Sequence, residues 1–183
     1  MQWDTDLFLW LNQDLGESTD RLMVLLSSKF IAIPLYLFLA WKVYQKSGKH
    51  IWKFLVGVAL MILVTDQTSV AFKNLVQRPR PCHETSLQGQ VHQVDRKCGG
   101  SYGFYSSHAT NTMAVAVLCI ATLETMWISA LLLIWVALVG YSRIYLGVHY
   151  PTDILTGWFM GAAIAFVFFR MLMKWVPLKT QDS

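Results

Sequence analysis

The stretch Ile154–Trp175, with the sequence ILTGWFMGAAIAFVFFRMLMKW, decides how the rest of the chain is interpreted. It is almost entirely apolar, and its two charged residues, Arg170 and Lys174, stand near its end. A helix needs about 20 predominantly apolar residues to cross the hydrocarbon core of a bilayer. The stretch therefore predicts a membrane-spanning helix. Gly157 and Gly161 have the spacing found where membrane helices pack closely, although chance also produces this spacing.

Four further apolar windows of similar length precede this one. They are Leu22–Tyr44, Ile51–Val76, Ala109–Leu123 with extensions to Ser106 and Glu124, and Trp127–Leu146. The composition agrees, because 55% of the 183 residues are hydrophobic and 14% are charged, against about 25% charged in a soluble domain. We therefore expect an all-α membrane protein with about five transmembrane helices in a single domain, residues 1–183, and not a soluble or disordered chain.

The first 20 residues have a different pattern. Apolar side chains recur at helical spacing at Trp3, Leu7, Trp10, Leu11 and Leu15. The segment is too short to span a bilayer, so residues 1–20 predict an amphipathic helix that lies in the membrane interface.

Lys and Arg set the expected orientation, because they concentrate in cytoplasmic loops. They cluster in the turn after the first window and at the C-terminal end (Lys42, Lys46, Lys49, Lys53, Arg170, Lys174, Lys179). The acidic N-terminus and the loop 77–105 then lie outside. That loop is itself basic (Arg78, Arg80, Arg96, Lys97), which fits only if its bases have another function. The net charge of +4 is scattered between apolar windows and indicates no nucleic-acid partner.

Three polar clusters stand at helix ends on the outer side. Two of them carry phosphate-binding groups: Lys73 with Arg80, and the serines Ser106 and Ser107 where a helix begins. Arginine forks match phosphate oxygens, and the free N–H groups of a helix start favour an anion. Arg143, in the third cluster, adds another cation. The three clusters together predict a phosphate site.

The same clusters contain two histidines with complementary uses. His149 and Asp153 are four residues apart, so the carboxylate can orient the imidazole and leave its other nitrogen free to attack. His108, beside the two serines, can protonate the leaving oxygen. These residues supply a nucleophile, an orienting acid and a general acid with no metal and no cofactor.

These residues resemble the three motifs of the type 2 phosphatidic acid phosphatase superfamily, written K-x6-RP, PSGH and SR-x5-H-x3-D. The first and third motifs match in full, with Lys73, Arg80, Pro81, Ser142, Arg143, His149 and Asp153. The middle motif keeps Ser106 and His108 but has Tyr105 in place of Pro and Ser107 in place of Gly. Because a glycine there contributes mainly a backbone N–H, which serine also has, we expect Ser107 to serve the phosphate site as well.

The resemblance implies a residue-by-residue mechanism. His149 forms a phosphohistidine, Asp153 assists it and His108 is the acid. The phosphate is held by Lys73, Arg80, Ser106 and Arg143.

The expected function is a metal-independent lipid phosphatase in the cell inner (plasma) membrane, with its active site on the extracytoplasmic, periplasmic side. Undecaprenyl pyrophosphate, phosphatidylglycerol phosphate, phosphatidic acid and lipid A phosphate all remain open as substrates. A lipid phosphotransferase using the same intermediate, and a non-catalytic membrane protein on the same fold, are the alternatives.

Three further predictions concern polar residues outside the motifs. Asp66, inside a span and seven residues before Lys73, either partners a positively charged residue of the site or bonds to a neighbouring helix. Arg78 is expected to be solvated or near lipid headgroups. Cys82 and Cys98 share the outer loop, where a disulfide can persist, so we expect them to pair; unpaired thiols and a zinc site with His83 and His92 are the alternatives. Cys119 should stay a buried thiol.

Overall fold

The computed structural model describes residues 2–94 and 98–176; Arg96, Lys97 and Lys179 lie outside these ranges. Helices dominate the described residues, and the only β-pairing there is an isolated bridge between Pro79 and Tyr102. The α-helices are α1 (Gln2–Leu11), α2 (Glu17–Ser27), α3 (Ala32–Ser47), α4 (Ile51–Val76), α5 (Ser107–Leu123), α6 (Met126–Tyr145) and α7 (Pro151–Trp175). One-turn 3₁₀ helices lie at Gly48–His50, Pro81–His83 and Thr85–Leu87.

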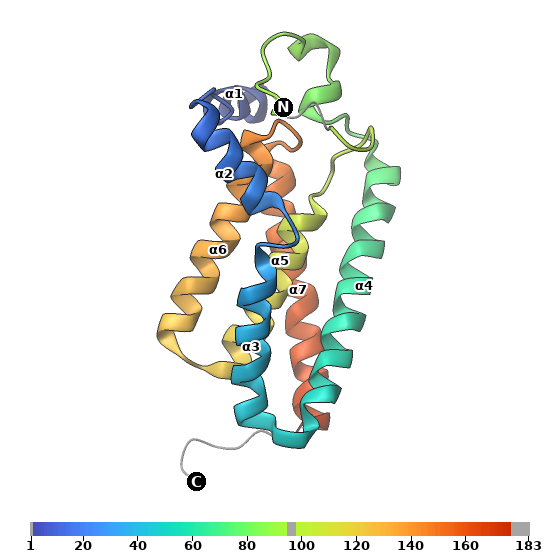
Figure 1. Cartoon of the computed structure of the whole chain (residues 1–183). Helices are drawn as coiled ribbons and strands as arrows, with labels where there is room; N and C mark the ends of the chain where they lie inside the picture. Colours follow the sequence, from blue (N-terminus) through green and yellow to red (C-terminus); the bar gives the residue numbers. More distant parts are fainter. Residues whose placement is uncertain (1, 95–97, 177–183) are drawn as a thin grey trace.

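The long helices run side by side as a bundle with α5 in its interior (Figure 1). Helix α5 packs against α3, α4, α6 and α7. Its small residues, such as Ala109 and Ala114, are fully buried, so its neighbours can approach closely. Large apolar side chains of α4 and α7, such as Leu75 and Phe159, instead point outward and are 78% and 72% exposed, as expected of surfaces that face lipid.

Three helical stretches are long and apolar enough to cross a membrane: Ala32–Val76, Met126–Tyr145 and Pro151–Trp175. The first contains α3 and α4, which are joined by the turn at Gly48–His50. Helix α5 is apolar but shorter. The all-helical membrane architecture predicted from the sequence is therefore confirmed.

Two predicted boundaries were wrong. The window Leu22–Tyr44 is interrupted, because α2 ends at Ser27 and α3 begins at Ala32. The Ser28 hydroxyl accepts from the Phe30 N–H, and such local bonds compete with the helix. The helix predicted over residues 1–20 is likewise divided, because α1 ends at Leu11 and α2 begins at Glu17. Gly16, just before α2, has a φ of 89°, a backbone conformation that favours glycine.

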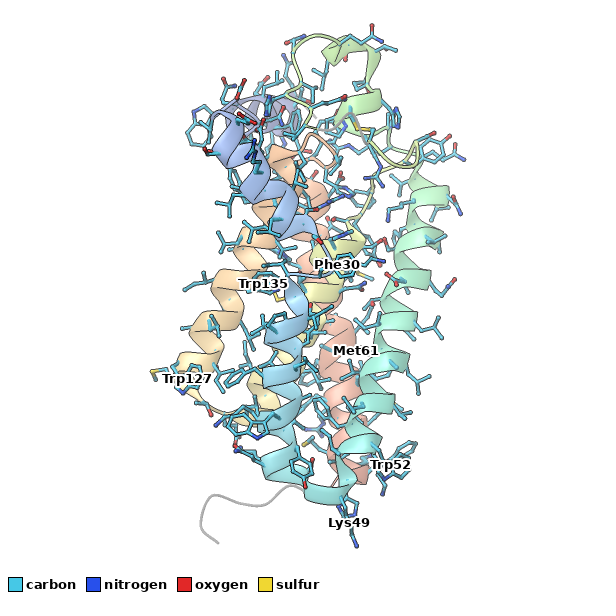
Figure 2. All side chains as sticks on the ribbon, in the orientation of Figure 1. Phe30, Lys49, Trp52, Met61, Trp127 and Trp135 are labelled. Carbon is cyan, nitrogen blue, oxygen red and sulfur yellow. A yellow bond between two sulfur atoms is a disulfide. The ribbon has the colours of Figure 1, made fainter. Side chains whose placement is uncertain are left out.

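The basic segments lie together at one end of the bundle, as the charge pattern predicted. The Lys53 ammonium donates to the Trp175 carbonyl at 3.2 Å, which joins the α3–α4 turn to the end of α7. Near this end Lys49 lies at the tip, and Trp52 and Trp127 project outward (Figure 2), an arrangement typical of a membrane interface. The opposite end carries α1, α2, the described parts of the loop 77–105 (77–94 and 98–105) and the α6–α7 junction (Figure 1).

Two glycines bring α7 against α5. A Cβ at Gly157 would lie 2.9 Å from the Ser106 carbonyl oxygen, and one at Gly161 would overlap the Thr110 carbonyl. Both obstacles are backbone atoms, which cannot move aside as a flexible side chain can. The small-residue spacing therefore reflects a real contact, and it fixes α7 relative to the start of α5.

We expect Gly161→Ala to destabilise the protein, because the added methyl group must push α7 away from α5. Overpacking of this kind costs roughly 1–3 kcal/mol, which should appear as a lower thermal midpoint in detergent. Gly100→Ala is the control, since a Cβ there has no atom within 4 Å. Equal midpoints for the two variants would contradict the close approach.

Candidate active site

Asp153 is the carboxylate on which the site is built. It lies in the first turn of α7, after Pro151, and it is fully buried. Its Oδ2 accepts from the Tyr150 N–H at 3.0 Å and lies 3.4 Å from His149 Nδ1. The same oxygen thus closes the start of α7 and orients the histidine, as the four-residue spacing predicted.

His149 is held as a neutral imidazole. Its Nε2 lies 3.2 Å from the Arg80 guanidinium, and because a guanidinium can only donate, Nε2 must present a lone pair. The proton is therefore on Nδ1, toward Asp153. Burial lowers the pKa of His149 well below its usual value, and the nearby charges of Arg80, Arg143 and Lys73 lower it further.

Backbone carbonyls and a close glycine position Arg80 beside the histidine. Its Nε donates to the Gly100 carbonyl at 2.7 Å and its Nη1 to the Val148 carbonyl at 3.2 Å. Gly103 lies close to both side chains of the pair Arg80 and Asp153: a Cβ on this glycine would be 3.2 Å from Arg80 Cγ and 3.2 Å from Asp153 Oδ2. No motif or spacing in the sequence predicted that Gly103 belongs to the site.

Lys73 connects α4 to the start of α5. Its ammonium donates to Ser69 Oγ and Ser107 Oγ, both at 2.7 Å, and the Ser69 hydroxyl donates to the Tyr105 carbonyl at 3.0 Å. Ser106 is fully buried, and its hydroxyl accepts from the Ala109 N–H to cap α5. Ser107 therefore contacts a motif cation, whereas the Ser106 hydroxyl is engaged by the helix.

Arg143 reaches the site from the last turn of α6. Its Nη1 donates to the Ser27 hydroxyl at the end of α2, a contact that the sequence did not predict. Among the described residues, Lys73, Arg80 and Arg143 form no ion pair. They are held by hydroxyls and carbonyls, so their three charges are available to an anion.

A cavity of about 540 Å³ extends from the site into the bundle. Polar side chains line one part of its wall (Ser27, Ser28, Lys29, Asp66, Ser107, His108, Asn111, Thr112). Most of its wall is apolar, from α3, α4, α5 and α6 (Ala32, Tyr36, Leu39, Ala40, Phe54, Leu55, Val58, Ile62, Val115, Cys119, Trp135, Val139). Asp66 accepts from the Asn111 amide of α5 at 2.9 Å, which favours the helix-bonding interpretation of this residue.

Arg78 does not have the environment predicted for it. Its side chain is only 23% exposed and its guanidinium binds Asp4 at 2.7 Å and Asp153 at 3.2 Å. The prediction of a solvated or headgroup-facing arginine was wrong because it considered Arg78 without the N-terminal helix. Asp4, which is fully buried, belongs to the acidic N-terminus that the charge pattern places on the outer side.

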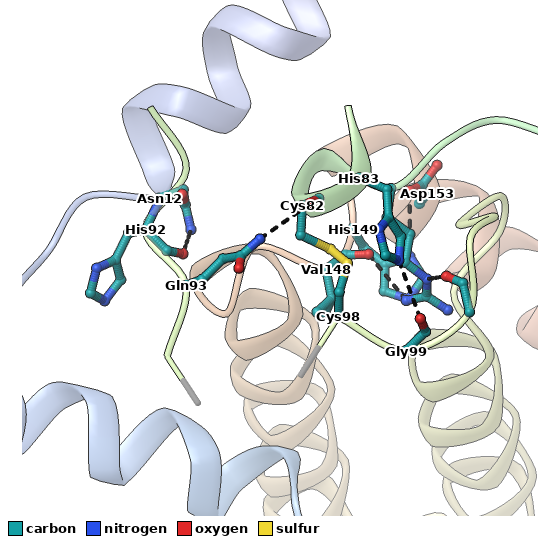
Figure 3. The surroundings of a disulfide bond; sticks show 12 residues. Asn12, Cys82, His83, His92, Gln93, Cys98, Gly99, Val148, His149 and Asp153 are labelled. Carbon is teal, nitrogen blue, oxygen red and sulfur yellow. Dashed lines mark hydrogen bonds and ion pairs between the residues drawn. A yellow bond between two sulfur atoms is a disulfide. The ribbon is translucent and has the colours of Figure 1, made fainter. Parts of the chain in front are cut away.

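The outer loop is anchored beside the site by a disulfide. The structure joins Cys82 and Cys98, the predicted pair, with their Cα atoms 6.0 Å apart, and Figure 3 shows the bridge near Val148 and His149. The Cys82 N–H donates to the Gly147 carbonyl at 3.2 Å. Both sulfurs are used in the bridge, and Cys119 is a buried free thiol.

The chain is similar to known proteins over nearly its whole length. The family model described as the PAP2 superfamily matches residues 50–177. A lipid A 4'-phosphatase of Bacteroides thetaiotaomicron is 31% identical, over 98% of this chain and 81% of the relative. An undecaprenyl-diphosphatase of Sulfolobus acidocaldarius is 26% identical, over 90% and 76%.

Two solved structures share the fold. The PAP2-type phosphatidylglycerolphosphate phosphatase of Bacillus subtilis superposes with a TM-score of 0.72 at 19% identity, covering 100% of this chain and 88% of that one. Aquifex aeolicus LpxE gives 0.69 at 22% identity, covering 91% and 94%.

We expect the Cys82–Cys98 bridge to be oxidised in protein purified from membranes without reductant. Peptide mapping by mass spectrometry should find the two cysteines linked, with Cys119 as the matched free thiol. A bridge that closes about 15 residues contributes about 3 kcal/mol in the chain-entropy model, so Cys98→Ser should lower the thermal midpoint. Alkylatable Cys82 and Cys98 in most molecules would reject the bridge.

Proposed function

This chain belongs to the PAP2 superfamily, and on that premise we propose that it is a metal-independent lipid phosphatase. One observation carries the proposal: His149 presents an unprotonated Nε2 among three cations that have no carboxylate partner among the described residues. Such a site suits a phosphate anion, and relatives at 31% and 26% identity are named for phosphatase activity on lipids.

The reaction proceeds in two steps through a phosphohistidine. His149 Nε2 attacks phosphorus, a P–N bond forms and the P–O bond to the leaving group breaks, while His108 gives the leaving oxygen its proton. Water then attacks phosphorus, His108 takes the water's proton, and His149 leaves with its lone pair. Asp153 accepts from Nδ1 throughout and stabilises the positive imidazole of the intermediate.

The cavity favours a lipid substrate over a soluble phosphate ester. Its polar part includes His108, the proposed acid, and most of its wall is apolar. A leaving group protonated by His108 would therefore continue into an apolar space that suits a hydrocarbon chain. Undecaprenyl pyrophosphate, phosphatidylglycerol phosphate, phosphatidic acid and lipid A phosphate all combine such a chain with a phosphate.

The proposed topology has five spans, α3 to α7, with α1 in the interface. The Lys-rich α3–α4 turn and the end of α7 face the cytoplasm. The site, at the other end of the bundle (Figure 1), then faces the periplasmic side of the inner membrane. Exposed Trp3 and Trp10 on α1 support an interfacial position.

The proposal is tested by phosphate release from a panel of the four lipid phosphates, with and without a strong chelator. We expect release from at least one lipid, undiminished by the chelator, and ¹⁸O from labelled water in the phosphate. His149→Ala should abolish release without changing the elution volume or thermal midpoint, because it removes the nucleophile. His83→Ala, at an exposed loop histidine, is the matched control.

Full activity in His149→Ala would reject the phosphohistidine route. Loss of all activity in chelator would reject the metal-free mechanism. Phosphate that carries no ¹⁸O, with a phosphorylated alcohol as product, would identify a phosphotransferase.

Arg143→Lys tests whether the guanidinium fork grips the phosphate. Lysine keeps the charge but loses the planar pair of donors, so kcat should fall at least about tenfold, or roughly 1.4 kcal/mol. Arg170→Lys, an exposed arginine at the far end of α7, is the control. Unchanged kinetics in Arg143→Lys would mean that the residue acts only as a charge.

A further inference from the structure

Helix α1 places a charged side chain in the interior. Asp4 is fully buried and its carboxylate has three donors: the Arg78 guanidinium at 2.7 Å, the Thr152 N–H at 3.1 Å and the Thr152 hydroxyl at 2.5 Å. Burying a carboxylate is expensive unless every oxygen is paired. This contact therefore holds α1 against the start of α7.

Arg78 extends the contact to the proposed catalytic pair. Its Nη2 binds Asp4, while its Nη1 donates to the Thr152 hydroxyl at 2.7 Å and to Asp153 Oδ1 at 3.2 Å. Its guanidinium also lies over the Tyr150 ring, 3.8 Å from the centroid. A single planar cation thus bridges two buried carboxylates.

The contact with Arg78 determines which partners the two carboxylate oxygens of Asp153 have. Oδ1 is held by Arg78, and Oδ2 is left for Tyr150 N–H and His149 Nδ1. Without Asp4, the full charge of Arg78 would act on Asp153 alone. The carboxylate would then be a weaker acceptor for the histidine and would stabilise a positive imidazole less.

We propose that Asp4 is a positioning residue for the reaction, acting through Arg78 on Asp153 and hence on His149. The inference rests on the proposed function, in which His149 is the nucleophile. It makes α1, outside the matched motifs and the family-model range, a supporting part of the active site. Phe8, one turn after Asp4 on α1, packs edge-on against Tyr150 with the ring centroids 5.4 Å apart and holds the helix in place.

The test compares Asp4→Asn with Asp6→Asn, which removes the same charge from an exposed position on the same helix. Because Asp4→Asn removes the carboxylate that shares the charge of Arg78 with Asp153, we expect its kcat to fall at least about tenfold. KM should change less than about twofold, since Asp4 does not touch substrate. Rates are taken per mole of monodisperse protein, with phosphate release from the best lipid of the panel as the assay.

A double-mutant cycle that combines Asp4→Asn with Arg78→Gln tests whether Asp4 acts through Arg78. If Asp4 acts through Arg78, the double variant should be no slower than the slower single variant; losses that multiply would overturn the proposal. Arg78→Lys supplies a second measurement should Asp4→Asn not fold, because lysine keeps the charge but cannot span both carboxylates. Wild-type kcat in Asp4→Asn or in Arg78→Lys would overturn it.

The two proposals fail in different ways. An active His149→Ala would reject the proposed function itself. If His149→Ala is inactive but Asp4→Asn and Asp6→Asn have the same kcat, only the positioning role is rejected. An Asp4→Asn variant with a raised KM and an unchanged kcat would also reject that role, because it would mean that Asp4 affects binding.

Discussion

A carboxylate buried at Asp153 is the constraint on which the site depends. A charge of this kind is stable only if donors surround it. Here they come from two places in the chain: the Tyr150 N–H and the His149 imidazole lie just before α7, and the Arg78 guanidinium belongs to the outer loop. Satisfying the carboxylate therefore brings the start of α7, the α6–α7 junction and the outer loop to one point. Asp4 adds α1 to the same point by pairing with Arg78.

The cations near Asp153 differ in whether a carboxylate neutralises them. Arg78 lies between two carboxylates and is neutralised, whereas Lys73, Arg80 and Arg143 are held by neutral oxygens in the described structure. Neutral acceptors fix the direction of a cation without cancelling its charge. The protein thus separates a paired arginine, which supports the histidine, from unpaired cations, whose field lowers the pKa of His149 and favours an anion.

The sequence predicted the features that depend on local spacing. The apolar windows located most of the helices, and the four residues from His149 to Asp153 predicted their contact. What it missed depends on long-range partners: Asp4 and Arg78 are 74 residues apart, and no periodicity connects them. The break between α2 and α3 was missed for a related reason, because Ser27 and Ser28 are too few to interrupt an apolar window by composition, yet Ser27 is positioned to bind Arg143.

Ser107, which stands where the family motif has glycine, shows how this site can retain its charge yet admit a phosphate. The Ser69 proton is used at the Tyr105 carbonyl, so in the 2.7 Å contact between the two hydroxyls the donor must be Ser107. Lys73 is then held by lone pairs of both serines. In the proposed reaction, turning the Ser107 hydroxyl toward a phosphate oxygen gives up only its bond to Ser69. Lys73 keeps its acceptor on Ser69, so the ammonium stays in place while the site gains a neutral donor at the start of α5.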